Sequence, residues 1–341
     1  MRLPRRLVVM VALAALTLTA CTNEVSDGGG EGATGGTSAP QAEGVTGRPV
    51  KVGFSAPGAD HGWLKAITDN ARKEADELGV DLILSEGTND TAGQVSQVET
   101  LISQKPDVLV ILPQEGGALT PIALKAMQAG IPVVNVDREF STPAAYRTLI
   151  GGDNYGIGEA AANFIANELN CQGNVVEIQG VAGISVTEQR SKGFTDGIKR
   201  CNGGIKIVAS QPADFLPDKG LQVMETMLQG HQDIDAVYTH DDDMAMGAVQ
   251  AIRNANRQDE MFVTGAGGSK DAMNLIAEGD LYRATFLYNP SMSASAVSLA
   301  KLIAERKGLS ELVEPEVPSR VELPATTVTK DNVASVQNLG Y

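Results

Sequence analysis

The chain has 341 residues, enough for two domains of ordinary size, and 43% of them are hydrophobic, so it can build substantial cores. Its formal net charge is −15 at pH 7. An acidic balance of this size argues against a nucleic-acid-binding protein and against electrostatic adhesion to anionic lipid.

The N-terminal segment has the features of a secretory signal that ends at a lipid-modified cysteine. Three arginines precede an apolar run over residues 7–18, and small residues then lead to Cys21. This pattern predicts a signal peptide over residues 1–20 and a lipid on Cys21, on the outer face of the cytoplasmic membrane. A transmembrane anchor is the alternative, but the run is shorter than the roughly 20 residues that span hydrocarbon.

Residues 21–48 consist mainly of Gly, Ser, Thr, Ala, Glu and Pro, with almost nothing to bury. Such a composition predicts a flexible linker that tethers the folded body to its lipid anchor. Removal of residues 1–20 leaves 24 basic and 42 acidic residues, a net charge of −18. The folded body is expected to begin near Pro49.

From Pro49 on, short apolar strands alternate with amphipathic helices. The first series is expected to have helices over residues 64–78, 91–103 and 117–129, and strands over 50–55, 80–85, 108–112 and 132–136. The second is expected to have helices over 155–169, 186–200, 218–229, 243–255 and 270–278, and strands over 149–151, 175–179, 205–209, 236–239 and 262–264. Repeated alternation predicts parallel sheets with helices on both faces, and two series predict two α/β lobes.

Two cysteines remain in the predicted mature body. Cys171 precedes one predicted strand and Cys201 follows the helix after it, so both are expected at the same edge of one strand–helix unit. Disulfides persist outside the cytoplasm, and we expect these two cysteines to pair. Two unrelated buried thiols are the alternative. The histidines show no metal-ligand spacing, so no metal and no cofactor are expected.

Polar and aromatic side chains follow several predicted strands, where ligands of open parallel sheets bind. The side chains singled out are Trp63, Asp137, Arg138, Arg190, Phe215 and Asp241. Aromatic faces cover the C–H side of a sugar ring, Asp and Arg bind hydroxyls, and balanced charge favours a neutral polyol. Asp137-Arg138 could instead cap a lobe edge, and Asp137 with Asp241 could form the carboxylate pair of a glycosidase. Of residues 241–243, we expect Asp241 to point into the cleft and one of the others to cap the next helix.

These segments resemble the ribose-type periplasmic sugar-binding proteins of ABC importers, particularly the galactofuranose-binding branch. The resemblance is carried by residues 52–55 with Gly62-Trp63, 131–138, 175–180, Arg190 with Gly193-Phe194, 210–215, 241–244 with Gly247-Ala248, and the ending 338–341. It implies a type I periplasmic-binding-protein fold, with two Rossmann-like lobes joined by a three-strand hinge. It places the N-terminal lobe at residues 49–152 plus 289–318, and the C-terminal lobe at 153–288 plus 319–341. The three crossings are expected near residues 151–152, 288–289 and 317–321.

The resemblance also implies a role for individual residues. Trp63 would stack on the sugar and Phe215 would form the other apolar wall. The hydroxyls would be bound by Asp137, Arg138, Arg190 and Asp241, with Asp60 and His61 as further contacts on the first loop. The chain departs from the family at Gly267, where an acidic residue is usual, and at Leu287, where ribose-type proteins carry an amide. Both changes remove hydroxyl partners, so the sugar cannot be copied from a relative.

Together these features predict a lipid-anchored, extracytoplasmic, monomeric binding protein that delivers a monosaccharide to an ABC permease. It is expected to have no catalytic residue, no cofactor, no nucleic-acid partner, and membrane contact through the lipid alone. Two alternatives remain: a sugar receptor for a membrane signalling protein, and a secreted carbohydrate-active enzyme.

Overall fold

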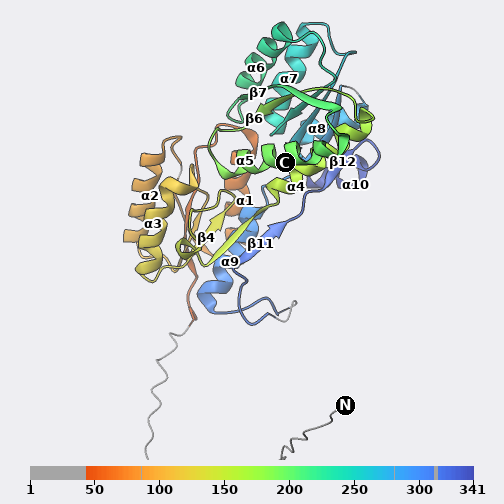
Figure 1. The fold of residues 1–341 in the computed structure, drawn as a ribbon. Coiled ribbons are helices and arrows are strands. Elements are labelled where there is room, and N and C mark those ends of the chain that lie inside the picture. Colours follow the sequence, from red (N-terminus) through yellow and green to blue (C-terminus); the bar gives the residue numbers. More distant parts are fainter. Residues whose placement is uncertain (1–43, 86, 280, 311–313) are drawn as a thin grey trace, which may run out of the picture. The chain divides into compact units, whose positions relative to one another are not determined.

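The computed structural model describes residues 44–85, 87–279, 281–310 and 314–341 (Figure 1). The predicted signal peptide, Cys21 and the linker up to residue 43 lie outside the described residues. The described residues belong to one compact unit. Within them, no helix is long and apolar enough to cross a membrane.

The first lobe is built around a sheet that has six parallel strands among the described residues, in the order β11-β5-β4-β3-β1-β2. The strands are β1 (Lys51–Ser55), β2 (Asp81–Ser85), β3 (Val108–Ile111), β4 (Val133–Val136), β5 (Thr148–Gly152) and β11 (Arg320–Leu323). The helices are α1 (Gly62–Leu78), α2 (Thr91–Ser103), α3 (Gly116–Gln128) and α9 (Met292–Glu305), with a 3-10 turn η1 (Pro143–Ala145).

Alternate residues of β3 point to opposite faces of this sheet, as expected for a strand buried on both sides. Val108 and Val110 pack in the cluster that includes α1 and α9, whereas Leu109 and Ile111 pack with α2 and α3. Figure 1 shows α2 and α3 side by side. The near-continuous apolar runs read from the sequence are explained by burial under helices on both faces.

The second lobe has a sheet in the order β12-β10-β9-β8-β6-β7, in which only β12 is antiparallel among the strands described. Its strands are β6 (Gly173–Gln179), β7 (Ile205–Pro212), β8 (Ala236–Thr239), β9 (Phe262–Gly267), β10 (Tyr282–Leu287) and β12 (Thr327–Thr329). Its helices are α4 (Asn154–Glu168), α5 (Ser185–Gly197), α6 (Pro217–Gly230), α7 (Asp242–Asn254), α8 (Lys270–Glu278) and α10 (Val333–Val336), with 3-10 turns η2 (Ile198–Cys201) and η4 (Gln337–Leu339). The apolar residues of α4 and α5 cover one face, and those of α6, α7 and α8 cover the other. Two parallel-dominated α/β lobes confirm the predicted fold class.

Three connectors join the lobes, after Gly152, between Leu287 and Met292, and between Leu323 and Thr327. The prediction for the third, around residues 317–321, is wrong because Arg320 pairs with Leu149 in the first sheet. The strand over residues 149–151, predicted to open the second series, is β5 and also belongs to the first sheet. Sequence order alone does not show which sheet an edge strand joins.

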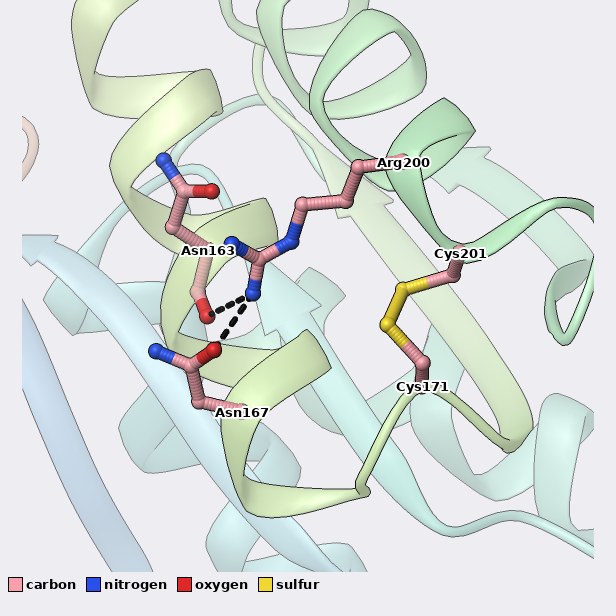
Figure 2. Close-up of a disulfide and its surroundings, with 5 residues drawn as sticks. All are labelled: Asn163, Asn167, Cys171, Arg200 and Cys201. Carbon is pink, nitrogen blue, oxygen red and sulfur yellow. Dashed lines mark hydrogen bonds between the residues drawn. A yellow bond between two sulfur atoms is a disulfide. The ribbon is translucent and has the colours of Figure 1, made fainter.

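Cys171 and Cys201 form a disulfide, as predicted, with their Cα atoms 5.0 Å apart. Cys171 lies between α4 and β6, and Cys201 ends η2, so the bond joins the two ends that the sequence placed at one edge. Figure 2 shows a second link beside it, in which the Arg200 guanidinium donates to the main-chain oxygen of Asn163 and the side-chain oxygen of Asn167. The disulfide therefore lies at the start of β6, away from the carboxyl ends of the strands.

Candidate functional site

A cavity with about 340 Å³ of empty space lies between the lobes, beyond the carboxyl ends of their strands. Its lining residues come from both lobes and from the second connector: His61, Trp63, Asp137, Arg138, Val186, Arg190, Phe215, Asp241, Ala266, Gly267 and Tyr288. Seven of the eight predicted contact residues are among them. Asp60 is not, and its carboxylate accepts a hydrogen bond from Asn89 Nδ2 at 3.1 Å.

An aromatic pair forms one part of the wall. Trp63, in the first turn of α1, is 5% exposed, and its indole Nε1 donates to the main-chain oxygen of Tyr288 at 2.7 Å. The two rings stack with their centroids 5.6 Å apart at 29°. Because Tyr288 lies on the second connector, this pair links the site to the hinge.

Asp137 and Arg138 follow β4 directly, and both are buried. The Tyr288 hydroxyl donates to Asp137 Oδ1, and Arg138 Nη1 donates to the main-chain oxygen of Gln114 at 2.8 Å. Arg138 Nε has no hydrogen-bond partner among the described residues and lies 3.8 Å from Asp137 Oδ2. Burial lowers the pKa of Arg138, and the Asp137 carboxylate opposes this shift. Asp137 and Arg138 therefore line the cavity and do not cap a lobe edge.

Arg190 of α5 is held by three contacts. Its Nε donates to Asn154 Oδ1 at 2.9 Å, its Nη1 donates to the main-chain oxygen of His240, and its Cζ lies 4.5 Å from the Tyr288 ring centroid. Because these contacts fix the guanidinium, its remaining N–H groups can donate to a ligand without further loss of side-chain entropy.

Phe215 supplies the aromatic ring of the second lobe. It follows β7 with a left-handed φ of 64°, which turns the chain back toward the cavity. A methyl group on Gly180 would lie 2.1 Å from this ring, so glycine at position 180 is what allows the ring to fit.

The three consecutive aspartates have three different partners. Asp241 is itself the N-cap of α7: its Oδ1 accepts from the backbone N–H groups of Asp243 and Met244 at 2.8 and 3.1 Å. The expectation that Asp242 or Asp243 caps this helix is therefore wrong, although Asp241 does line the cavity. Burial, and then the neighbouring Asp243 carboxylate, raise the pKa of Asp241 to about 7, while His61 opposes them.

Asp242 is fully buried and braces the turn between β9 and α8. Its carboxylate accepts four hydrogen bonds at 2.6–2.7 Å, from the backbone N–H groups of Gly268 and Ser269 and the hydroxyls of Tyr282 and Thr285. It fixes the segment that includes Gly267.

Asp243 reaches across to the first lobe. Its Oδ2 accepts from the backbone N–H of Gly62 at 3.1 Å and lies 3.5 Å from His61 Nδ1. His61 is the N-cap residue of α1 but provides no side-chain cap, so the cap of this helix comes from the opposite lobe. Burial lowers the pKa of His61, but the carboxylates of Asp243, Asp241 and Asp60 outweigh it and the net pKa is raised.

One group of side chains among the described residues could hold a metal ion. A ligand atom from each of His61, Asp241 and Asp243 lies within 4.8 Å of the other two. Both carboxylates already accept backbone hydrogen bonds. When protonated, His61 offsets part of the negative charge of the two carboxylates.

Sequence reasoning assigned no role in the site to Tyr288, Asn154, Val186 or Ala266. Tyr288 had one available signal, since it is an aromatic residue at a predicted crossing, directly after Leu287. Asn154, Val186 and Ala266 lie in segments that follow predicted strands, but the contact of Asn154 with Arg190 depends on how α4 and α5 pack. Gly267 lines the cavity without a side chain, and Leu287 packs against Gly268 instead.

Comparison with known proteins places this geometry in a family. A family model described as a periplasmic binding protein domain matches residues 52–308. The ribose import binding protein of Bacillus subtilis (strain 168) is 36% identical over 241 residues, covering 71% of this chain and 77% of that protein. The crystal structure of a galactofuranose binding protein superposes with a TM-score of 0.79 at 30% identity, covering 86% of this chain and all of that one.

A third structure, the fructose binding periplasmic domain of a hybrid two component system, superposes with a TM-score of 0.77 at 30% identity, covering 85% of this chain and 93% of that one. All three relatives are binding proteins or binding domains, so the enzyme alternative is set aside. The chain belongs to the periplasmic binding protein family, in its ribose-type group of sugar-binding proteins.

Proposed function

We propose that the chain is an extracytoplasmic lipoprotein that binds a neutral monosaccharide between its lobes and delivers it to an ABC permease. The observation that carries the proposal is the composition of the cavity. It combines an aromatic ring from each lobe, Trp63 and Phe215, with two buried arginines and two buried aspartates. This is the chemistry that recognises a ring with an apolar face and a hydroxylated edge.

The charge balance supports a neutral ligand. Arg138 and Arg190 share the site with the carboxyl groups of Asp137 and Asp241, so a charged ligand would meet buried groups of its own sign as well as of the opposite sign. Hydroxyl groups can accept from the arginines and donate to the aspartates without adding charge.

The division of the site between lobes supports a mechanism of closure. Trp63, Asp137 and Arg138 would hold the sugar on the first lobe, and Arg190, Phe215 and Asp241 would engage it when the cleft shuts. A ligand shifts a conformational equilibrium only by its differential contact with the two states, and the second-lobe contacts supply that difference. Three connectors permit a hinge but restrain twisting.

The predicted export signal supports the cellular part of the proposal. Cys21 would carry the lipid, the linker residues after it would act as the tether, and the monomeric body would present the loaded sugar to a permease. The fructose-binding sensor domain among the similar structures favours one second candidate, a receptor for a membrane signalling protein. Both candidates share the same ligand site and differ in partner.

The test is binding of a defined panel (D-ribose, L-arabinose, D-galactose, D-fructose and myo-inositol) to the mature chain. Thermal-shift screening should find at least one binder, because a sugar at 100 times its Kd adds about 2.7 kcal/mol of stability. Calorimetry should then show weaker binding for Arg190→Ala and Trp63→Ala but not for Arg283→Ala, a surface arginine of the second lobe paired with Glu168. No binder in the panel, or affinities within twofold of the parent for both site variants, would overturn the proposed site.

A measurement of sugar uptake distinguishes an ABC permease from a membrane signalling protein as the partner. Deletion of the gene should abolish import of the sugar that the protein binds. Unchanged import together with loss of a transcriptional response to that sugar would instead support the sensor.

A further inference from the structure

Tyr341 lies beside the interlobe cavity: it is not among the residues that line the cavity, but its hydroxyl packs against Gly267, which is one of them. Its main-chain oxygen accepts from the backbone N–H of Lys270 at 3.2 Å, and Asn289 Nδ2 donates to the main-chain oxygen of Leu339 at 3.0 Å. These two contacts fix the tail between α8 and the second connector. The tail is therefore anchored in a defined position.

The ring of Tyr341 lies close to both lobes. A methyl group on Gly62, at the start of α1, would be 3.7 Å from its Cε2 atom, and a methyl group on Gly267 would be 2.7 Å from its hydroxyl oxygen. Gly267 lines the cavity and has a φ of 135°, a region that side-chain-bearing residues rarely adopt. The space that a side chain at position 267 would need is thus occupied by the Tyr341 hydroxyl.

This hydroxyl is buried and has no hydrogen-bond partner in the described part of the chain. A buried hydroxyl left unpaired destabilises the protein that contains it, so this group calls for a partner that the described residues do not supply, such as a water molecule or a ligand hydroxyl. Burial and the carboxylates of Asp241, Asp242 and Asp243 keep its pKa well above the usual value. The group therefore keeps its proton and can donate.

We propose that the Tyr341 hydroxyl is a specificity-determining contact of the sugar site, bonding a sugar hydroxyl at the position where Gly267 offers no side chain. The inference rests on the proposed sugar-binding function. It also accounts for the acidic residue that is missing at position 267, because the hydroxyl partner comes from the end of the chain.

The primary test is Tyr341→Phe, which removes only the hydroxyl. Calorimetry with the tightest-binding sugar of the panel should show affinity weakened by about 5- to 30-fold, since a sugar hydroxyl loses its partner inside a closed site. The melting temperature without sugar should stay unchanged or rise, because the variant also removes an unpaired buried polar atom. A purely structural role would instead lower the melting temperature. Tyr155→Phe, whose hydroxyl bonds Asp196 at the surface of α4, is the matched control.

Two further measurements sharpen the assignment. Among deoxy analogues of that sugar, one should bind the parent weakly but lose no further affinity to Tyr341→Phe, which identifies the bonded hydroxyl. Gly267→Ala should weaken binding by displacing the tyrosine, and adding Tyr341→Phe should restore part of that loss because the clashing oxygen is gone. If the parent binds a panel sugar and Tyr341→Phe binds it within threefold, the inference is overturned while the proposed function stands. If the parent binds no panel sugar, the proposed function fails first.

Discussion

The cross-lobe cap of α1 gives a sharp prediction about affinity. Asp243→Ala removes the carboxylate that accepts from the Gly62 N–H at 3.1 Å and pairs with His61 at 3.5 Å. Gly62 and His61 lie on the first lobe and Asp243 lies on the second, so this contact exists only when the lobes are closed. We therefore expect the variant to disfavour closure without touching the sugar.

The size of the effect depends on the exposure of the partners. Loss of a helix cap costs about 1 kcal/mol, and a partly exposed ion pair contributes about 0.2–1 kcal/mol. The Asp243 side chain is 24% exposed and Gly62 is exposed, so water can replace part of the contact when the carboxylate is removed. A total of about 1–2 kcal/mol corresponds to a factor of about 5–30 in the closing equilibrium.

When the open form dominates the free protein, the apparent Kd rises by the same factor for every sugar, because the competent fraction falls. Calorimetry across the panel measures this, and small-angle scattering measures the fraction closed without sugar. Asp218→Ala is the matched control, since Asp218 lies in the first turn of α6 and faces solvent. A change below twofold, or one that differs strongly between sugars, would refute the reasoning.

The remaining predictions concern export, redox state and pH. Cys21→Ser should release the protein from the membrane fraction; retention equal to the parent would place the anchor elsewhere. Peptide mapping without reductant should recover Cys171 joined to Cys201, and Cys171→Ala with Cys201→Ala should lower stability by about 3–4 kcal/mol; free thiols in exported protein would contradict this. The pKa of Asp241 is about 3.8 in the unfolded chain and about 7 in the fold. Protonation of Asp241 therefore stabilises the fold fully below about pH 3.8, and this contribution is lost as the pH rises through 7. Asp241→Asn should remove that part of the melting-temperature slope between pH 4 and 7, and an unchanged slope would contradict the assignment.

The sequence predicted the elements up to residue 278 because most of their strands, apart from the edge strands β2 and β7, are buried on both faces and their helices carry an apolar stripe. It missed the elements beyond that residue. Tyr282–Leu287 is interrupted by the exposed Arg283, and the small residues of α9 weaken its apolar face. The edge strand β11 is only partly buried, so its pattern does not reveal which sheet it joins.

The site shows a similar limit. Residues that directly follow strands, such as Asp137 and Asp241, can be placed from topology alone. Tyr288 and Tyr341 reach the site from a connector and from the end of the chain, through contacts with residues that are distant in the sequence. The cap of α1 by Asp243 likewise depends on how the two lobes meet.

The position of the disulfide bears on ligand recognition. It ties the segment after α4 to the end of the α5–η2 segment. Asn154 is the first residue of α4, Arg190 lies in the second turn of α5, and Arg190 Nε donates to Asn154 Oδ1. The two helices pack so closely that a methyl group on Gly193 would lie 2.1 Å from the main-chain oxygen of Tyr155. The disulfide therefore clamps, at one end, the two packed helices whose side chains hold the Arg190 guanidinium in place at the cavity.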